Sequence, residues 1–239
     1  MDVPETVATA LADRAVAGKR CLEAGAGAGN ATLGLLAAGA REVLAVTDDR
    51  EHAATVRERV AATQSESVRT IEADLRDIPL ADETVEVVTA HALCNVVTTA
   101  ELPAIADELT RVAAPGAQLV VDDYAPLPDR AAMADIFALE NAAGQLADGR
   151  PPLTFYPESL LRSVFESRSW TFQRRKALLD PVPWTETHVE AHADVARAAA
   201  TSLDGDLGDA LAAEADRLIE AIGSESVGEM YSLAFRLDG

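Results

Sequence analysis

Residues 22–30 read Leu-Glu-Ala-Gly-Ala-Gly-Ala-Gly-Asn, so that an acidic residue precedes three glycines at alternate positions. An apolar run at residues 20–23 leads into this segment, and a helical pattern starts at Asn30. Glycine adopts backbone conformations closed to other residues and lets a ligand approach the main chain closely. The N-terminus of the following helix favours a negative group such as a carboxylate. The segment therefore predicts a turn between strand and helix that binds a nucleotide-like ligand.

Further polar side chains follow later strand-like runs. Asp48 and Asp49 come after the run at residues 43–46, and Asp74 comes after the run at 68–73. His91 follows a fourth run at 85–90. Parallel strands bind ligands at their carboxyl ends, so these side chains are candidates to meet the ligand of the glycine turn. Asp48 or Asp49 also fits the cap of the next helix, and one residue can do both.

The elements that position these residues alternate along the chain. We expect strands at residues 20–23, 43–46, 68–73, 85–90 and 118–121, with one helix at 30–38, a second that opens at Asp48 and runs to about 62, and a third that opens at Thr98 and runs to about 113. Asp48 with Glu51, and Thr98 with Glu101, resemble capping boxes that open the second and third helices. Strands separated by helices imply a parallel sheet with right-handed crossovers.

The last third of the chain is less regular. Helices are expected at residues 129–146, 157–168, 186–200 and 207–222, and strands at 170–178 and 230–237. No repeat and no long linker divides the chain. We therefore expect one α/β domain over residues 1–239, with a ligand-binding half at 1–125 and a second half at 126–239.

The glycine turn has the form Glu-x-Gly-x-Gly-x-Gly, which resembles the first motif of the class I S-adenosylmethionine-dependent methyltransferases. A dinucleotide fingerprint instead needs glycine or alanine three positions after its second glycine. Asn30 and Thr32 stand there in the two possible counts, which disfavours a nicotinamide oxidoreductase. The resemblance continues through residues 72–88 and the helix, Pro-Gly turn and strand of residues 109–121, and it covers roughly residues 18–125.

The resemblance implies a doubly wound, Rossmann-like sheet of seven strands with an antiparallel last strand. It also implies S-adenosylmethionine as cofactor, with ribose hydroxyls on Asp48 or, as the fallback, Asp49. Asp74 and the Leu75 backbone would meet the adenine, and His91 would contact the cofactor or act as a base. The residues expected to hold the cofactor are Glu23, Ala24, Gly25, Gly27, Asp48, Asp49, Asp74, Leu75 and His91.

The family normally joins its last two strands by a short hairpin, whereas about 50 residues, at 180–229, lie between them here. The two helices expected there either roof the acceptor pocket or form a homodimer contact. Residues 125–157 are expected to form a second wall of that pocket. These additions to the sheet should set the choice of acceptor, and they contain no readable motif.

The composition of the chain limits the kinds of partner that it can bind. The chain has 20 Lys and Arg against 40 Asp and Glu, a formal net charge of −20. This balance opposes nucleic acid and anionic membranes as partners, because such binding rests on neutralising phosphates. Dispersed acidity with only two lysines is typical of proteins from salt-loving microbes. Two cysteines make no disulfide framework, and the absence of a long apolar run or signal-like start favours the cytoplasm.

A small-molecule methyl acceptor is therefore the expected partner, since the polar and aromatic motif of amide-methylating and adenine-methylating relatives is absent after residue 90. Two alternatives remain: a non-catalytic sensor of the cofactor or its product, and an RNA methyltransferase. No catalytic residue is assigned, although Asp122, Asp123 and Tyr124 end the fifth strand where the acceptor would lie. His188 and His192 stand four apart on a helix, which fits a zinc pair, but a solvated helix face is preferred and no metal is expected.

Overall fold

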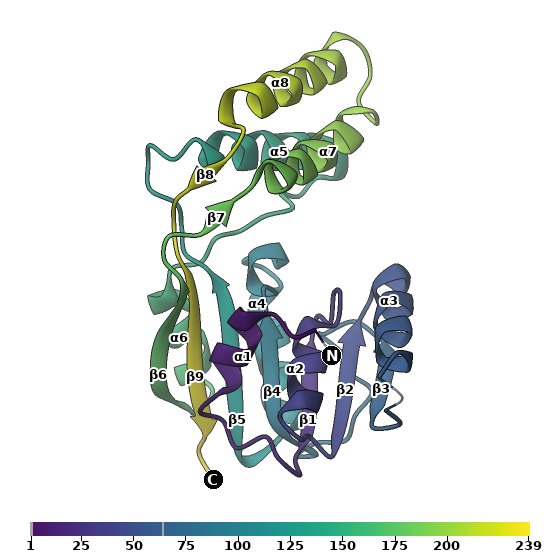
Figure 1. Ribbon diagram of the computed structural model, residues 1–239, viewed down its shortest axis with the longest axis vertical. Helices are drawn as coiled ribbons and strands as arrows, with labels where there is room; N and C mark the ends of the chain where they lie inside the picture. The colour runs from purple at the N-terminus through teal and green to yellow at the C-terminus, as the bar shows by residue number, and fades with distance from the viewer. Residues whose placement is uncertain (1, 64) are drawn as a thin grey trace.

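The computed structural model describes residues 2–63 and 65–239, and its centre is a seven-stranded sheet in the order β3-β2-β1-β4-β5-β9-β6 (Figure 1). The strands are β1 (Arg20–Ala24), β2 (Glu42–Thr47), β3 (Val68–Glu72), β4 (Val85–His91), β5 (Ala113–Tyr124), β6 (Trp170–Leu179) and β9 (Met230–Leu237). Strands β1 to β5 pair in parallel, and β9 runs antiparallel to both of its neighbours. The expected seven-stranded, doubly wound sheet with an antiparallel last strand is confirmed.

Both faces of the sheet are covered by helices (Figure 1). Alternate strand residues point to opposite faces, so Cys21 packs in the cluster with α1 (Glu5–Leu11) and α2 (Asn30–Ala37), and Leu22 packs in the other cluster. That second cluster includes α4 (Leu102–Val112) and α6 (Glu158–Glu166). Helix α3 (Arg50–Ala61) packs on β2 and β3. Two buried faces explain why the central strands read as continuous apolar runs.

The strand order reverses between β1 and β4. From β1 the chain builds outward through β2 to β3, then returns to place β4 on the other side of β1. Connections therefore diverge at the carboxyl ends of β1 and β4, which opens a crevice where ligands bind in such sheets. The glycine turn follows β1 at this point.

The buried carboxylate of Glu23 holds the end of β1 to the start of α2. It is 2% exposed and accepts hydrogen bonds from the backbone N–H of Ala31 at 3.1 Å and of Thr32 at 2.7 Å. The Thr32 hydroxyl also donates to it. These donors are among the backbone groups that a helix N-terminus leaves unpaired, so Glu23 acts as a remote cap. The glycine turn is thereby closed from beneath.

A helical cap stands beyond the carboxyl ends of the strands (Figure 1). It consists of α5 (Met133–Asp148), α7 (Glu186–Ala200), α8 (Asp206–Ile222) and the hairpin of β7 (Pro183–Trp184) with β8 (Glu225–Ser226). The helical cap has a hydrophobic cluster of its own, in which Ile136, Val189 and Leu218 are buried. Glu225 joins the hairpin to α5 by accepting hydrogen bonds from the backbone N–H groups of Ala132 and Met133.

The predicted elements differ from the observed ones mainly where segments are short. Helix α7 and strand β9 have the predicted bounds, but α1, the 3-10 helix η1 (Cys94–Val96), β7 and β8 were not predicted. The helix expected after Asp48 is capped by Asp49 instead, whose side chain accepts from Glu51 and His52 at 2.7 and 2.9 Å. The capping box on Asp48 is therefore wrong by one residue.

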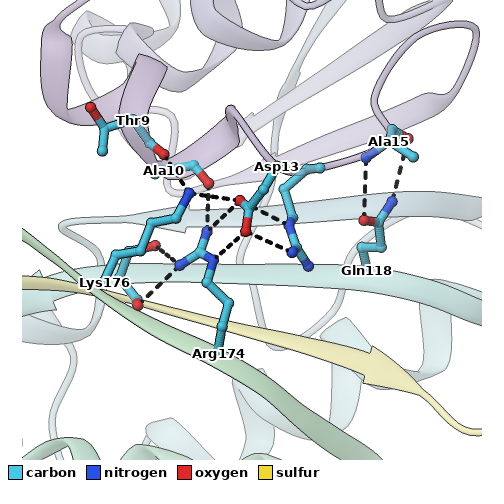
Figure 2. Close-up of polar contacts among 9 residues, drawn as sticks. Thr9, Ala10, Asp13, Ala15, Gln118, Arg174 and Lys176 are labelled. Carbon is cyan, nitrogen blue, oxygen red and sulfur yellow. Dashed lines mark hydrogen bonds and ion pairs between the residues drawn. The ribbon is translucent and has the colours of Figure 1, made fainter.

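An ionic cluster ties the N-terminal segment to the strand at one end of the sheet. Figure 2 shows Asp13, in the loop after α1, between Arg174 and Lys176 of β6, with N–O distances of 3.0 and 2.9 Å. Arg174 and Lys176 also donate to the carbonyls of Ala10 and Thr9. Partial burial raises the pKa of Asp13, but hydrogen bonds from Lys176, Arg14 and Arg174 outweigh it and hold that pKa well below its usual range.

Across residues 2–63 and 65–239, no helix combines the length and apolar character needed to cross a membrane.

We predict that Asp13→Asn lowers the free energy of unfolding at pH 7 by about 1 kcal/mol, a value that allows for the exposure of the side chain. The depressed pKa means that the carboxylate stabilises the fold above the ordinary aspartate pKa of about 4 and loses this effect as pH falls toward the folded value. Denaturant unfolding at several pH values measures the difference. It should shrink below about pH 4, and an unchanged gap in acid would contradict the assignment.

We predict that Glu23→Gln lowers the free energy of unfolding by about 2 kcal/mol or more, because the amide turns a donor group toward buried N–H groups. Glu72→Gln is the matched control. Glu72 also ends a strand, but its side chain is 38% exposed and pairs with Arg57 at the surface, so its loss should stay below about 1 kcal/mol. Equal losses in the two variants would show that Glu23 does not hold the turn.

Candidate functional site

A cavity of about 570 Å³ opens at the carboxyl ends of β1, β2 and β4. We call it the main cavity. Eight of the nine predicted cofactor residues line it, namely Glu23, Gly25, Gly27, Asp48, Asp49, Asp74, Leu75 and His91. The ninth, Ala24, is fully buried at the end of β1 and is not part of the lining. The sheet therefore brings the predicted residues together around one cavity, although they lie as much as 68 positions apart in the chain.

The glycine turn approaches its neighbours too closely for a side chain at its first position. Gly25 has φ +69°, and a Cβ atom there would lie 2.5 Å from Cδ1 of Leu93, in the loop after β4. Arg59 of α3 braces the outer side of the turn by donating to the carbonyl of Ala28 and to Oδ1 of Asn30. This arginine was missed by the sequence analysis, because nothing local relates α3 to the turn.

The carboxylates beyond β2 have different surroundings. Asp49 uses Oδ1 to cap α3, and the backbone N–H groups of His52 and Glu51 lower its pKa. Asp48 lines the main cavity, and no hydrogen bond within the described chain engages its side chain. Of the two residues, Asp48 has the carboxylate more available to a ligand.

The side chain of Asp74 is held by that of Arg76. Arg76 donates to both of its oxygens and lowers the pKa of Asp74 to about 2, so this group is a carboxylate at neutral pH. A carboxylate has about four acceptor positions, which leaves capacity for a ligand. Arg76 itself lines the main cavity and faces Glu101 at 3.7 Å, an ionic rim that the sequence analysis did not identify.

His91 lies at the base of the main cavity with its Nδ1 at 3.1 Å from Oδ2 of Asp122. Burial lowers the pKa of His91, but the hydrogen bond to Asp122 and the charges of Asp122, Glu23 and Asp123 outweigh it and raise that pKa. Burial raises the pKa of Asp123 to about 7, although the backbone N–H groups of Tyr124 and Asn95 donate to its oxygens. Asp122 and Asp123 are thus enclosed below the cavity floor rather than open to an acceptor.

A second, smaller pocket of about 260 Å³ lies under the helical cap. We call it the aromatic pocket. Its walls include Phe137 of α5, Phe155 and Trp184, with ring centroids 5.0 Å apart for the two phenylalanines and 5.3 Å for Phe137 and Trp184. Tyr124, at the end of β5, lines both this pocket and the main cavity. The two spaces therefore meet at one residue.

His188 and His192 both line the aromatic pocket. The preferred expectation of a solvated helix face is wrong for His192, whose Nδ1 lies 2.7 Å from Oε2 of Glu140, a carboxylate only 4% exposed on α5. His188 is exposed and receives the backbone N–H of Thr185 at the start of α7. Within residues 2–63 and 65–239, no group of three or more His, Cys, Asp or Glu side chains gathers as a metal site would require.

Comparison with known proteins gives a similarity of part of the chain to one family model, and a shared fold. Residues 21–116 match the family model described as a methyltransferase domain. No curated protein sequence matches the chain.

Solved structures match over nearly the whole chain. A putative methyltransferase from Bacillus halodurans has a TM-score of 0.68 at 15% identity, covering 98% of this chain and 99% of that one. The YcgJ protein from Bacillus subtilis has a TM-score of 0.67 at 15% identity, covering 98% of each chain.

Geranyl diphosphate C-methyltransferase from Streptomyces coelicolor A3(2), solved with Mg²⁺, geranyl diphosphate and S-adenosylhomocysteine, has a TM-score of 0.61 at 14% identity. The match covers 96% of this chain and 76% of that one. Residues 21–116 are therefore similar to a methyltransferase domain, and the chain shares its fold with these solved methyltransferase structures.

Proposed function

We propose that this protein transfers the methyl group of S-adenosylmethionine to a small-molecule acceptor. The observation that carries the proposal is the pair of adjoining spaces, one lined by the glycine turn and carboxylates, the other by aromatic rings, with Tyr124 common to both. The first suits a polar nucleoside cofactor and the second suits a compact apolar acceptor. The Streptomyces enzyme, which has a similar fold, was solved in complex with both geranyl diphosphate and S-adenosylhomocysteine.

In this proposal the residues of the main cavity divide the cofactor among them. The glycine turn and the N-terminus of α2 receive the carboxylate end, Asp48 receives the ribose hydroxyls, and Asp74 with the Leu75 backbone receives the adenine. Glu23 is a positioning residue, because the first turn of α2 engages both of its oxygens. The fit is chemically reasonable, since the cavity offers acceptors to a ligand rich in donors and carrying a positive charge.

The bound cofactor supplies an already activated methyl group. The chain has to hold the acceptor in line with it and keep water out, and orientation alone can supply much of a rate enhancement. Tyr124 stands where such alignment is needed, because it lines both the main cavity and the aromatic pocket, and the helical cap supplies further walls of the latter. We propose on this basis that residues 1–125 form the cofactor half and residues 126–239 the acceptor half.

The surface charges support a small acceptor over RNA. Basic side chains in and just before β6 form ion pairs with acidic neighbours. Arg175 on β6 pairs with Glu158 and Glu229, and Arg168, between α6 and β6, pairs with Asp107. Charges of this kind protect the strand at the end of the sheet order. A phosphate backbone would have to displace these partners on a chain of net charge −20.

We predict that Gly27→Val weakens S-adenosylmethionine binding about tenfold or more. Gly27 lines the main cavity with φ +46°, and a Cβ atom there meets no protein atom closer than 3.9 Å, so the added side chain takes ligand space. Isothermal titration calorimetry measures the change.

Gly18→Val is the matched control, because Gly18 has φ +74°, has open space around it and lies away from the main cavity. Both variants strain the backbone by about 1–2 kcal/mol, but only the first should lose affinity. Unaltered binding by Gly27→Val would place the cofactor elsewhere.

We predict that Asp48→Asn weakens S-adenosylmethionine binding about tenfold, because charge-assisted hydrogen bonds to hydroxyls are lost. Asp49→Asn should change it less than about twofold, since asparagine caps a helix as well as aspartate. The same calorimetry compares them. A larger effect at Asp49 would reverse the assignment of the ribose ligand.

A further inference from the structure

His192, in the lining of the aromatic pocket, pairs with a carboxylate that lies outside that lining, and cofactor binding does not use this pair. Glu140 lies on α5 and is 4% exposed, and its only hydrogen-bond partner among residues 2–63 and 65–239 is His192 of α7. The N–O distance of 2.7 Å is that of a charge-assisted hydrogen bond. The pair joins residues 52 positions apart and places the imidazole at the wall of the pocket.

The carboxylate fixes the tautomer of His192. A carboxylate only accepts hydrogen bonds, so Nδ1–H is the donor in this pair and the lone pair of the neutral ring lies on Nε2. The edge of the ring is packed against Phe137, with centroids 4.7 Å apart, which limits its rotation. An oriented imidazole with a buried carboxylate behind it is the arrangement that stabilises the imidazolium formed on taking a proton.

A second polar group in the same pocket lacks a partner. Asn95 lines the pocket, and its Oδ1 is buried without a hydrogen bond from any described residue. A buried carbonyl oxygen of this kind needs a donor. The pocket lining thus includes two side chains with acceptor atoms, His192 and Asn95, among aromatic rings. This combination fits a ligand with a planar apolar body and O–H groups.

We propose that the methyl acceptor is a small aromatic alcohol, of the phenol class, and that His192 takes its proton with Glu140 as the supporting carboxylate. In the step, the acceptor oxygen gives a lone pair to the methyl carbon, and the carbon–sulfur bond breaks with its electron pair left on sulfur. The acceptor proton passes to Nε2 of His192. The methylation of this acceptor rests on the proposed function. The proton transfer to His192 involves only residues in and around this pocket, so it can be tested without the cofactor.

The test uses the whole protein without cofactor and 4-nitrophenol as probe. Its absorbance reports ionisation, and tryptophan fluorescence reports binding near Trp184. His188 on α7 and Tyr124 on β5 line the pocket together with His192, and Glu140 on α5 contacts the His192 ring from outside the pocket lining. We expect the bound probe to be phenolate at about pH 6, where the free probe is mainly protonated, a shift of about tenfold in its ionisation equilibrium.

His192→Gln should bind the probe yet lose this shift, and Glu140→Gln should reduce it. Glu190→Gln is the matched control, because Glu190 is exposed on the same helix and lies outside the pocket lining, and it should keep the shift. If His192→Gln fails to fold, Glu140→Gln decides, because an undiminished shift in that variant overturns the role of the pair.

Three results would overturn the inference: no binding of the probe, binding in its protonated form, or tighter binding of tetramethylammonium, which would indicate a cage for cations. Calorimetry with S-adenosylmethionine on the same preparation separates this inference from the proposed function. Cofactor binding without probe ionisation overturns the phenol acceptor alone. Probe ionisation without cofactor binding overturns the methyl transfer while leaving His192 as a base.

Discussion

One buried carboxylate organises the site. Glu23 is covered by the sheet and by α2, and three donors from the first turn of that helix converge on it. Because both of its oxygens are used, the end of β1 and the start of α2 are fixed relative to each other, and the glycine turn between them has little freedom. The turn then sets where the backbone faces the cavity, and Asp48, Asp74 and His91 are placed around it by the neighbouring strands. An interaction inside the protein thereby prepares a surface for a ligand.

The helical cap is also fixed by a carboxylate that binds the N-terminus of a helix. Glu225 closes the N-terminus of α5 from the β7–β8 hairpin, as Glu23 closes α2 from β1. Each carboxylate joins elements that are distant in sequence, by 8 to 9 positions in one case and by more than 90 in the other. The difference matters for prediction. The cap by Glu23 belongs to a motif that can be recognised, whereas the cap by Glu225 becomes visible only when the chain is folded.

The same division explains what sequence could and could not predict. The spacing of apolar residues and the placement of glycines located the sheet. Helix α7 and strand β9 have the predicted bounds, because each is long enough for the spacing of its apolar residues to define it. Strands β7 and β8 span two residues each, too short for any periodicity. The pairing of His192 with Glu140 crosses 52 positions, so His192 was assigned to solvent. In the main cavity, residues at or just after strand ends were predictable, Tyr124 among them, while Arg59 and the contact of Arg76 with Glu101 depended on which elements meet across space.

The position of β9 has a consequence for how the chain is made. Strand β9 lies between β5 and β6 and pairs with both, yet the ribosome synthesises it after every other strand. Strands β1 to β5 can pair as they emerge, whereas β6 has no partner in the sheet until β9 arrives. Until β9 is made, the edges of β5 and β6 expose unpaired backbone groups to other nascent chains. Completion of the sheet therefore depends on a segment that lies more than 50 residues after β6 begins.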